Sequence, residues 1–367
     1  MKILLAPDKF KGSLSAKGVC DALESGLRQN HPDAEIIKFP LADGGEGSLA
    51  VIANHLDGQW ITAKVNDPLF REIEAKYFLS GDAAYIEMAE ASGFDLLTHE
   101  ERNCLYTTTL GTGELINDAL NRGAKQVYLF IGGSATCDGG MGVAAALGYQ
   151  FLDDNGKYLK PFGENMLAVK KIIPPKEKIK ATFITLCDVN NPFYGKNGAA
   201  HVFGPQKGAD EKAVQQLDAG LKNLAEIVER DLGKSIADIP GVGAAGGLGG
   251  GSVAFLDANL QSGLQTIIQL VNFEKVASDV DVIITGEGKI DGQTLQGKVV
   301  QGVVTLAKAK KIPVHAVCGI TDLTAMEIQE LGLASCSQIM ENTNSIDEAF
   351  TMAFNILREL GSKITLQ

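Results

Sequence analysis

The sequence predicts an α/β protein that combines a doubly wound parallel sheet with a second, inserted α/β domain containing antiparallel strands. Strands and helices alternate near both ends of the chain, which is the order that parallel βαβ units require. The middle differs, because strand-like stretches at 60–65, 73–79 and 84–88 follow one another with only short turns between them. Strands joined in this way pair antiparallel.

The N-terminal part alternates strand and helix twice. The apolar run 2–6 predicts a first strand, and apolar periodicity predicts a helix over 16–28. A second strand is expected at 35–39, followed by the glycine-rich loop 41–47 and a helix over 48–56. This order indicates a parallel pair with helical crossovers.

After the three antiparallel strands, the pattern returns to helices and strands in turn. Helices are expected over 113–121, 141–147 and 210–230, and strands over 126–131 and 181–187. The C-terminal part then repeats the N-terminal alternation. Its expected elements are strand 280–285, loop 286–294, helix 297–308, strand 313–318, helix 324–331, strand 337–340 and helix 346–360.

The shared layout of the two chain ends predicts the domain division. A chain of 367 residues is long enough for two domains. We therefore assign 1–57 and 276–367 to one discontinuous Rossmann-like domain, and 58–275 to the inserted domain.

Composition narrows the classes of function. The formal net charge of −12 argues against nucleic-acid binding and a basic membrane-surface protein, but not against a small anionic ligand. The six Cys lack C-x-x-C spacing, which indicates neither a zinc site nor a redox dithiol and fits a reducing compartment. Without a signal peptide or a transmembrane-length apolar run, the sequence predicts a cytoplasmic protein with no membrane partner.

Acidic or glycine-rich loops follow five of the predicted strands. Ligands of open α/β sheets bind at the carboxyl ends of the strands, so these loops are the candidate site. They are PDKFKGS (7–13), LADGGEG (41–47), IGGSATCDGG (131–140), CDVNNP (187–192) and TGEGKIDGQT (285–294).

The loops divide into anion-binding and acidic groups. Gly132, Gly133 and Ser134 precede a helix, and successive backbone N–H groups in such a loop bind anions. Lys9 and Lys11 could add positive charge, although solvated surface is the simpler interpretation of either lysine alone.

The acids Asp43, Asp138, Asp188, Glu287 and Asp291 would repel a phosphate unless Mg²⁺ bridged them, or one could accept a proton from an attacking hydroxyl. Together with the anion-binding glycines they suggest Mg²⁺-dependent phosphoryl transfer. An Asp before Gly can also simply close its own turn, and Asp138 is the one we expect to brace the following helix.

Other classes fit less well. A nicotinamide oxidoreductase needs a strand before G-x-G-x-x-G, whereas Ile-Pro precedes GVGAAG at 241–246. A classical P-loop is absent, and the five His show no metal spacing. A non-catalytic small-molecule binding protein would not need a row of acids at the strand ends.

The motifs resemble the bacterial glycerate kinase type I family along essentially the whole chain. The matching segments are 6–16, 40–48, 131–142, 187–209, 243–251 and 285–298. The resemblance implies ATP-dependent phosphorylation of D-glycerate with Mg²⁺, in a cleft between a Rossmann-like and a second α/β domain. It favours the 2-hydroxyl and 2-phosphoglycerate, with 3-phosphoglycerate as the alternative, and it allows for a homodimer.

The resemblance also suggests roles for individual residues. Asp188 is expected to be the general base or to orient the glycerate hydroxyl, and Asp43 and Glu287 to hold Mg²⁺ or to order its waters. Arg71 is expected to bind the substrate carboxylate. Further expected contacts to substrate or phosphate are Asp8, Lys11, Gly132, Gly133, Ser134, Gly286, Gly288, Asp291, Gln293 and Lys298.

Three departures from the family pattern guide these choices. The family usually has Ser where this chain has Lys9, so Lys11 is the preferred catalytic lysine. It usually has Asp where this chain has Asn190, so Asp188 is the preferred catalytic acid of this loop. It usually has Gly where this chain has Phe70, which is expected to alter a turn.

Overall fold

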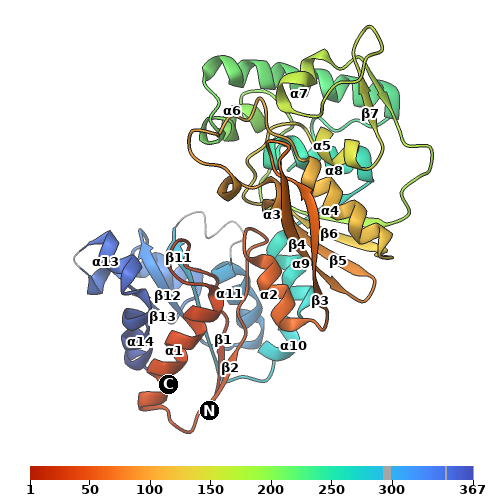
Figure 1. Ribbon diagram of the computed structural model, residues 1–367. Coiled ribbons are helices and arrows are strands. Elements are labelled where there is room, and N and C mark those ends of the chain that lie inside the picture. Colours follow the sequence, from red (N-terminus) through yellow and green to blue (C-terminus); the bar gives the residue numbers. More distant parts are fainter. Residues whose placement is uncertain (292–298, 344, 367) are drawn as a thin grey trace. The chain divides into compact units, whose positions relative to one another are not determined.

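The computed structural model describes residues 1–291, 299–343 and 345–366, and the chain divides into two compact units (Figure 1). The first unit comprises Met1–Asp43, Ala50–His55 and Gly263–Gln367. The second comprises Gly44–Leu49 and Leu56–Ser262. The predicted α/β class is confirmed in both units, which are described in turn.

A five-stranded parallel sheet forms the centre of the first unit. Its strand order is β13-β12-β11-β1-β2, and every neighbouring pair is parallel. The chain leaves β1 toward β2 and leaves β11 toward β12, so the order reverses between β1 and β11. The strands are β1 (Lys2–Leu5), β2 (Glu35–Lys38), β11 (Val282–Ile290), β12 (Val314–Thr321) and β13 (Ser335–Gln338).

Helices cover this sheet as a doubly wound fold requires. Right-handed crossovers that run in opposite directions place α1 (Ala16–Asn30) and α11 (Val299–Lys310) on opposite faces. The apolar face of α1 packs with α14 (Ala353–Lys363), and Figure 1 shows the two helices side by side. Ser15 caps α1 by accepting a hydrogen bond from the Gly18 backbone N–H at 3.1 Å. The other helices are α2 (Ser48–His55), α9 (Gly263–Leu270), α10 (Phe273–Ala277), α12 (Ala325–Leu331) and α13 (Ile346–Thr351).

The second unit is built on a six-stranded mixed sheet in the order β10-β9-β6-β5-β4-β3. The predicted antiparallel strands are confirmed, because β3 pairs with β4 and β4 with β5 in that sense. The remaining pairs are parallel. The strands are β3 (Gln59–Asn66), β4 (Glu72–Ser80), β5 (Ala83–Glu87), β6 (Gln126–Phe130), β9 (Thr182–Leu186) and β10 (Asn259–Gln261).

Two groups of buried side chains form the core of this second unit. One lies between the sheet and α4 (Leu110–Asn121), and the other surrounds α7 (Glu211–Leu232). A small antiparallel pair, β7 (Gln150–Leu152) and β8 (Lys171–Ile173), packs with the second group. The shorter helices are α3 (Ala89–Ser92), α5 (Met141–Ala146), α6 (Ala199–Phe203) and α8 (Leu248–Leu256).

The structure corrects several predicted boundaries. The predicted loop 286–294 is wrong over its first half, because β11 continues to Ile290. It continues because β12 itself extends to Thr321, which offers pairing partners as far as Ile290. The predicted closing helix is two helices, α13 and α14, that meet at Met352. The last strand lies two residues earlier than predicted, since Met340 already begins a 3-10 turn.

Within the described residues, no helix has both the length and the hydropathy that crossing a bilayer requires.

Candidate functional site

Three acids gather at the carboxyl edge of the first unit's sheet. Asp8 follows β1, Asp43 follows β2, and Glu287 lies within β11. The segment after β1 stays beside β11, since the Ala6 and Asp8 N–H groups donate to the carbonyls of Ile284 and Gly286 at 2.8 Å. The acids therefore flank the reversal point between β1 and β11, where doubly wound sheets bind ligands.

The surroundings of Asp8 disfavour its charged form. Its side chain is buried, with 7% of the residue exposed. Burial, together with the negative charges of Asp43 and Glu287, raises the pKa of the Asp8 carboxyl to about 8. The Lys9 backbone N–H donates to Asp8 Oδ1 at 2.6 Å and opposes this shift only in part. A cation held beside these carboxylates would restore the charged form of Asp8.

The acids suit Mg²⁺ better than a metal ion whose ligands all come from the protein. Carboxylate oxygens are hard ligands, and Mg²⁺ is usually held by one or two of them together with water and substrate phosphates. Among the residues that the structure describes, no group of three or more His, Cys, Asp or Glu is arranged to hold a metal ion. Asp43 and Glu287 therefore fit an Mg²⁺ site that phosphate oxygens would complete.

The glycines of β11 have different tasks. A side chain at Gly286 would collide with the Val317 carbonyl of β12, so Gly286 keeps the two strands paired. A Cβ at Gly288 would have room, with the Lys11 backbone N at 3.7 Å. Lys11 is exposed, and Asp291 forms an ion pair with Lys289 at 3.3 Å.

Two of the predicted site residues cannot be placed in this geometry. Gln293 and Lys298 lie outside the described residues.

In the second unit, two glycine loops touch. A Cβ at Gly132 would lie 2.9 Å from Gly45 Cα, so glycine at 132 is needed for the loops to approach this closely. Gly132 follows β6, and Asp188 follows the neighbouring strand β9. Phe130 pairs with Leu186, so the two loops leave adjacent positions at the same edge of the sheet. Asp188 is exposed there.

A buried lysine holds the Gly-Gly-Ser loop in place. Lys207 Nζ donates to Ser134 Oγ at 2.6 Å and to the Thr136 carbonyl at 2.7 Å. Only 2% of Lys207 is exposed, and burial lowers its pKa. We did not predict this role, because a lysine in a short polar segment ordinarily points to solvent. Its inclusion in the matching segment 187–209 was the available signal.

Asp138 has the bracing role that we expected. It is fully buried and accepts hydrogen bonds from the Thr109 N–H and Oγ1, both at 2.8 Å. The N–H groups of Gly140 and Gly142 also donate to it, at 3.0 and 3.1 Å. Asp138 thus fixes the start of α5, and its carboxylate is committed to this turn.

The guanidinium group of Arg71 is held by protein acceptors from its own loop and from the segment 96–101. Arg71 Nε donates to the buried Asp67, Nη1 to Glu101 at 2.6 Å, and Nη2 to the Leu96 carbonyl at 3.3 Å. All three guanidinium nitrogens thus have protein acceptors, so a substrate carboxylate would have to replace one. The preceding Phe70 has φ +63°, the left-handed conformation that glycine adopts most easily.

Comparison with known proteins decides the family. A model of the Glycerate kinase family matches residues 3–367. The chain belongs to the glycerate kinase family. It is therefore an enzyme, and specifically a kinase.

Individual relatives of this kinase match over nearly their full length. The chain is 42% identical to a glycerate kinase of Halalkalibacterium halodurans, covering 99% of this chain and 97% of that protein. It is 41% identical to the glycerate 2-kinase of Escherichia coli, covering 98% and 96%. A crystal structure of a candidate glycerate kinase 2 from Salmonella typhimurium LT2 aligns with a TM-score of 0.85 and 38% identity, covering 99% and 96%.

The glycine patch 241–251 of this kinase serves packing. A Cβ at Gly246 would collide with the Thr136 carbonyl, and one at Gly251 with the Gly139 carbonyl. Both collisions would be with the loop that follows β6. The patch therefore brings the start of α8 against that loop, which explains its glycine density without a dinucleotide.

Proposed function

We propose that this kinase transfers the γ-phosphoryl group of ATP to the 2-hydroxyl of D-glycerate in the cytoplasm, giving 2-phosphoglycerate and ADP, with Mg²⁺. The single observation that carries the proposal is the group of Asp8, Asp43 and Glu287 at the reversal point of the first sheet. Three acids at a ligand-binding edge call for a cation, and Mg²⁺ with nucleotide phosphates supplies one. The name of the Escherichia coli relative, glycerate 2-kinase, supports the 2-hydroxyl.

In this proposal Asp43 and Glu287 hold Mg²⁺, which neutralises phosphate charge during transfer. Asp8 feels the negative charge of both acids, and its raised pKa limits how much negative charge the group carries without a cation. Lys11, exposed after β1, neutralises phosphate oxygens. Lys298, Gln293 and Asp291 stay as predicted phosphate or substrate contacts.

The second unit provides the glycerate contacts in this proposal. Gly132, Gly133 and Ser134 bind the carboxylate or a phosphate through backbone N–H groups. Asp188 accepts the hydroxyl proton as the glycerate oxygen bonds to phosphorus and the bond to the ADP oxygen breaks. Arg71 keeps its predicted carboxylate role only if it exchanges a protein partner for the substrate.

Release of ADP tests the reaction directly. We expect ADP only when D-glycerate, ATP and Mg²⁺ are all present, and omission of any one of them should abolish it. No release with the complete mixture would overturn the proposal. Asp188→Asn should lower kcat by about 100-fold or more, within the usual contribution of general base catalysis. Near-normal turnover by this variant would remove the base assignment.

A further inference from the structure

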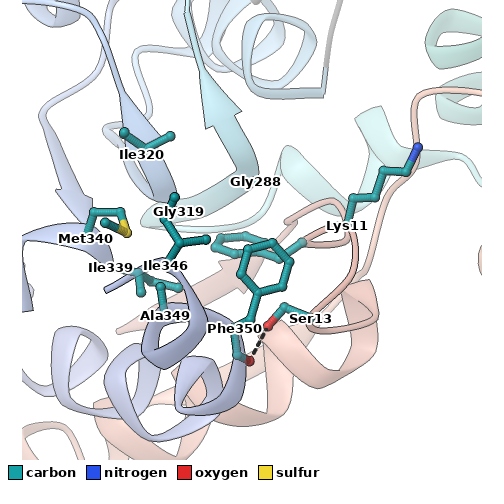
Figure 2. Close-up of a pocket in the computed structure, with 11 residues that line it drawn as sticks. Lys11, Ser13, Gly288, Gly319, Ile320, Ile339, Met340, Ile346, Ala349 and Phe350 are labelled. Atoms are coloured by element: carbon teal, nitrogen blue, oxygen red, sulfur yellow. Dashed lines mark hydrogen bonds between the residues drawn. The ribbon is translucent and has the colours of Figure 1, made fainter. Parts of the chain in front are cut away.

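An apolar pocket of about 270 Å³ lies in the first unit (Figure 2). It is lined by the loop after β1, by β11 and β12, by the residues just after β13, and by α13. Four of these five segments lie at or just beyond the carboxyl ends of parallel strands. The pocket therefore shares the sheet edge at which doubly wound folds bind ligands.

The pocket lining includes residues that closely follow Asp8 and Glu287 in the sequence. Phe10 and Lys11 come shortly after Asp8, and Gly288 comes directly after Glu287. The pocket thus borders the two chain segments that carry Asp8 and Glu287, the second of which we propose holds Mg²⁺. Apart from Lys11 and Gly288, no residue of this lining has a role in the proposed phosphoryl transfer.

The lining has an apolar wall and one charged end. Ile346, Phe350 and Ile320 line the pocket although 65%, 47% and 41% of their surfaces are exposed. Among the described residues that line the pocket, Lys11 is the single charged one. Figure 2 shows the Lys11 side chain extending away from the apolar side chains, with its nitrogen at the far end. A fitting ligand is flat and apolar at one end and anionic at the other.

The size of the pocket favours a fragment over a whole nucleotide. Pockets that hold drug-sized ligands usually measure about 300–1,000 Å³, and this pocket lies just below that range. A purine base fits such a volume, and the attached phosphates would lie outside it, near Lys11 and the acids.

Phe350 is held in position by the loop after β1. Ser13 Oγ donates to the Phe350 carbonyl at 3.0 Å. Gly12 has φ +77°, and a Cβ there would lie 2.8 Å from Phe350 Cε1. The absent side chain at Gly12 therefore leaves room for the ring, which presents a face on which a base can stack.

We propose that this pocket binds the adenine base of the nucleotide, with Phe350 as its stacking partner and Lys11 beside the phosphates. The inference rests on the proposed function, because it assumes that ATP is the phosphoryl donor. It adds the place of the base and the residue that sets affinity for it.

A matched pair of variants tests the proposal. Phe350→Ala removes the stacking ring, and Phe354→Ala removes an equally large ring of α14 that is 40% exposed and lies outside the pocket lining. We expect Phe350→Ala to raise the Kd for ADP and the KM for ATP about tenfold, within the usual contribution of base stacking. The KM for glycerate should stay unchanged, and Phe354→Ala should leave all three constants at wild-type values.

Tripolyphosphate, which lacks a base, provides the second readout. Its inhibition constant should be the same in the wild type and in Phe350→Ala. Equal losses for ADP and tripolyphosphate would overturn the assignment, because the variant would then have disturbed the phosphate region or the fold. Photolabelling of the wild type with 8-azido-ATP should modify the peptide that contains 339–350, and labelling elsewhere would contradict the proposal.

Failure of the inference differs from failure of the proposed function. A wild-type enzyme that releases no ADP would overturn both. An active wild type whose two phenylalanine variants bind ADP equally well would overturn the pocket assignment alone. A change of oligomeric state in Phe350→Ala with unchanged ADP binding would likewise overturn it, and would identify the face as a contact with a second copy.

Discussion

The protonation of Asp8, at the candidate site, makes the stability of the folded protein depend on pH. Its folded-state pKa is about 8, above the ordinary value of an aspartate, so the folded protein holds this proton more tightly than the unfolded chain does. The folded state must therefore lose stability as pH rises from about 4 to about 8. This direction is opposite to that of an aspartate in a salt bridge.

Asp8→Asn removes this pH dependence. Without ligands, we expect the variant to be more stable than the wild type at pH 8.5, by an amount on the order of a few kcal/mol, and to differ little at pH 5. Thermal unfolding at both pH values measures the effect. Asp33→Asn, an exposed acid of the same unit, should show no such pattern. A constant difference between Asp8→Asn and wild type at both values would contradict this explanation.

The buried Lys207 holds the Gly-Gly-Ser loop in place through two hydrogen bonds. Lys207→Met keeps the length of the side chain but leaves Ser134 Oγ and the Thr136 carbonyl without this donor. We expect a stability loss of about 1–3 kcal/mol and a KM for glycerate that rises more than the KM for ATP. The exposed Lys212→Met on α7 is the control. Equal effects on both KM values would argue for a general structural defect.

At the scale of elements, glycine density reflects contact between backbones. Gly251→Ala on α8 would force a Cβ against the Gly139 carbonyl, and we expect a destabilisation of about 1–3 kcal/mol or more. Gly18→Ala on α1 meets only ordinary contacts at 3.4 Å and should stabilise the protein by about 0.5–1 kcal/mol. Urea unfolding of the two variants compares them. A stabilised Gly251→Ala would show that α8 does not need this close approach.

Local sequence patterns predicted most of the strands and helices, and tertiary pairing decided the rest. The strand-like stretches and the short turns between them were sufficient to predict β3, β4 and β5 and their antiparallel pairing. The extension of β11 to Ile290 depends on the length of β12, which is distant in sequence. Apolar periodicity in 263–277 went unassigned, and α9 and α10 form there.

For the candidate site too, local sequence patterns predicted one part and tertiary contacts decided the rest. Its loops could be predicted because each follows a strand, and the glycines and acids in them are unusual. The proximity of Asp8 and Glu287 could not, since it arises from pairing of β1 with β11 across most of the chain. The protein partners of Arg71 and Lys207 are also distant in sequence or buried, so their occupied hydrogen bonds could not be foreseen.

At the scale of the whole molecule, a protein with net charge −12 must bind two anions, glycerate and ATP, in our proposal. Local features make this feasible: Mg²⁺ at the acids of the first unit, Lys11 beside its pocket, and backbone N–H groups in the second unit. In the proposal, each unit thus contributes a separate part of the chemistry.

Phosphorus and proton NMR of the product formed from D-glycerate, ATP and Mg²⁺ tests directly which hydroxyl is phosphorylated. We expect 2-phosphoglycerate together with an equal amount of ADP. Phosphate on the 3-hydroxyl, or ADP formed without a phosphorylated glycerate, would contradict this expectation.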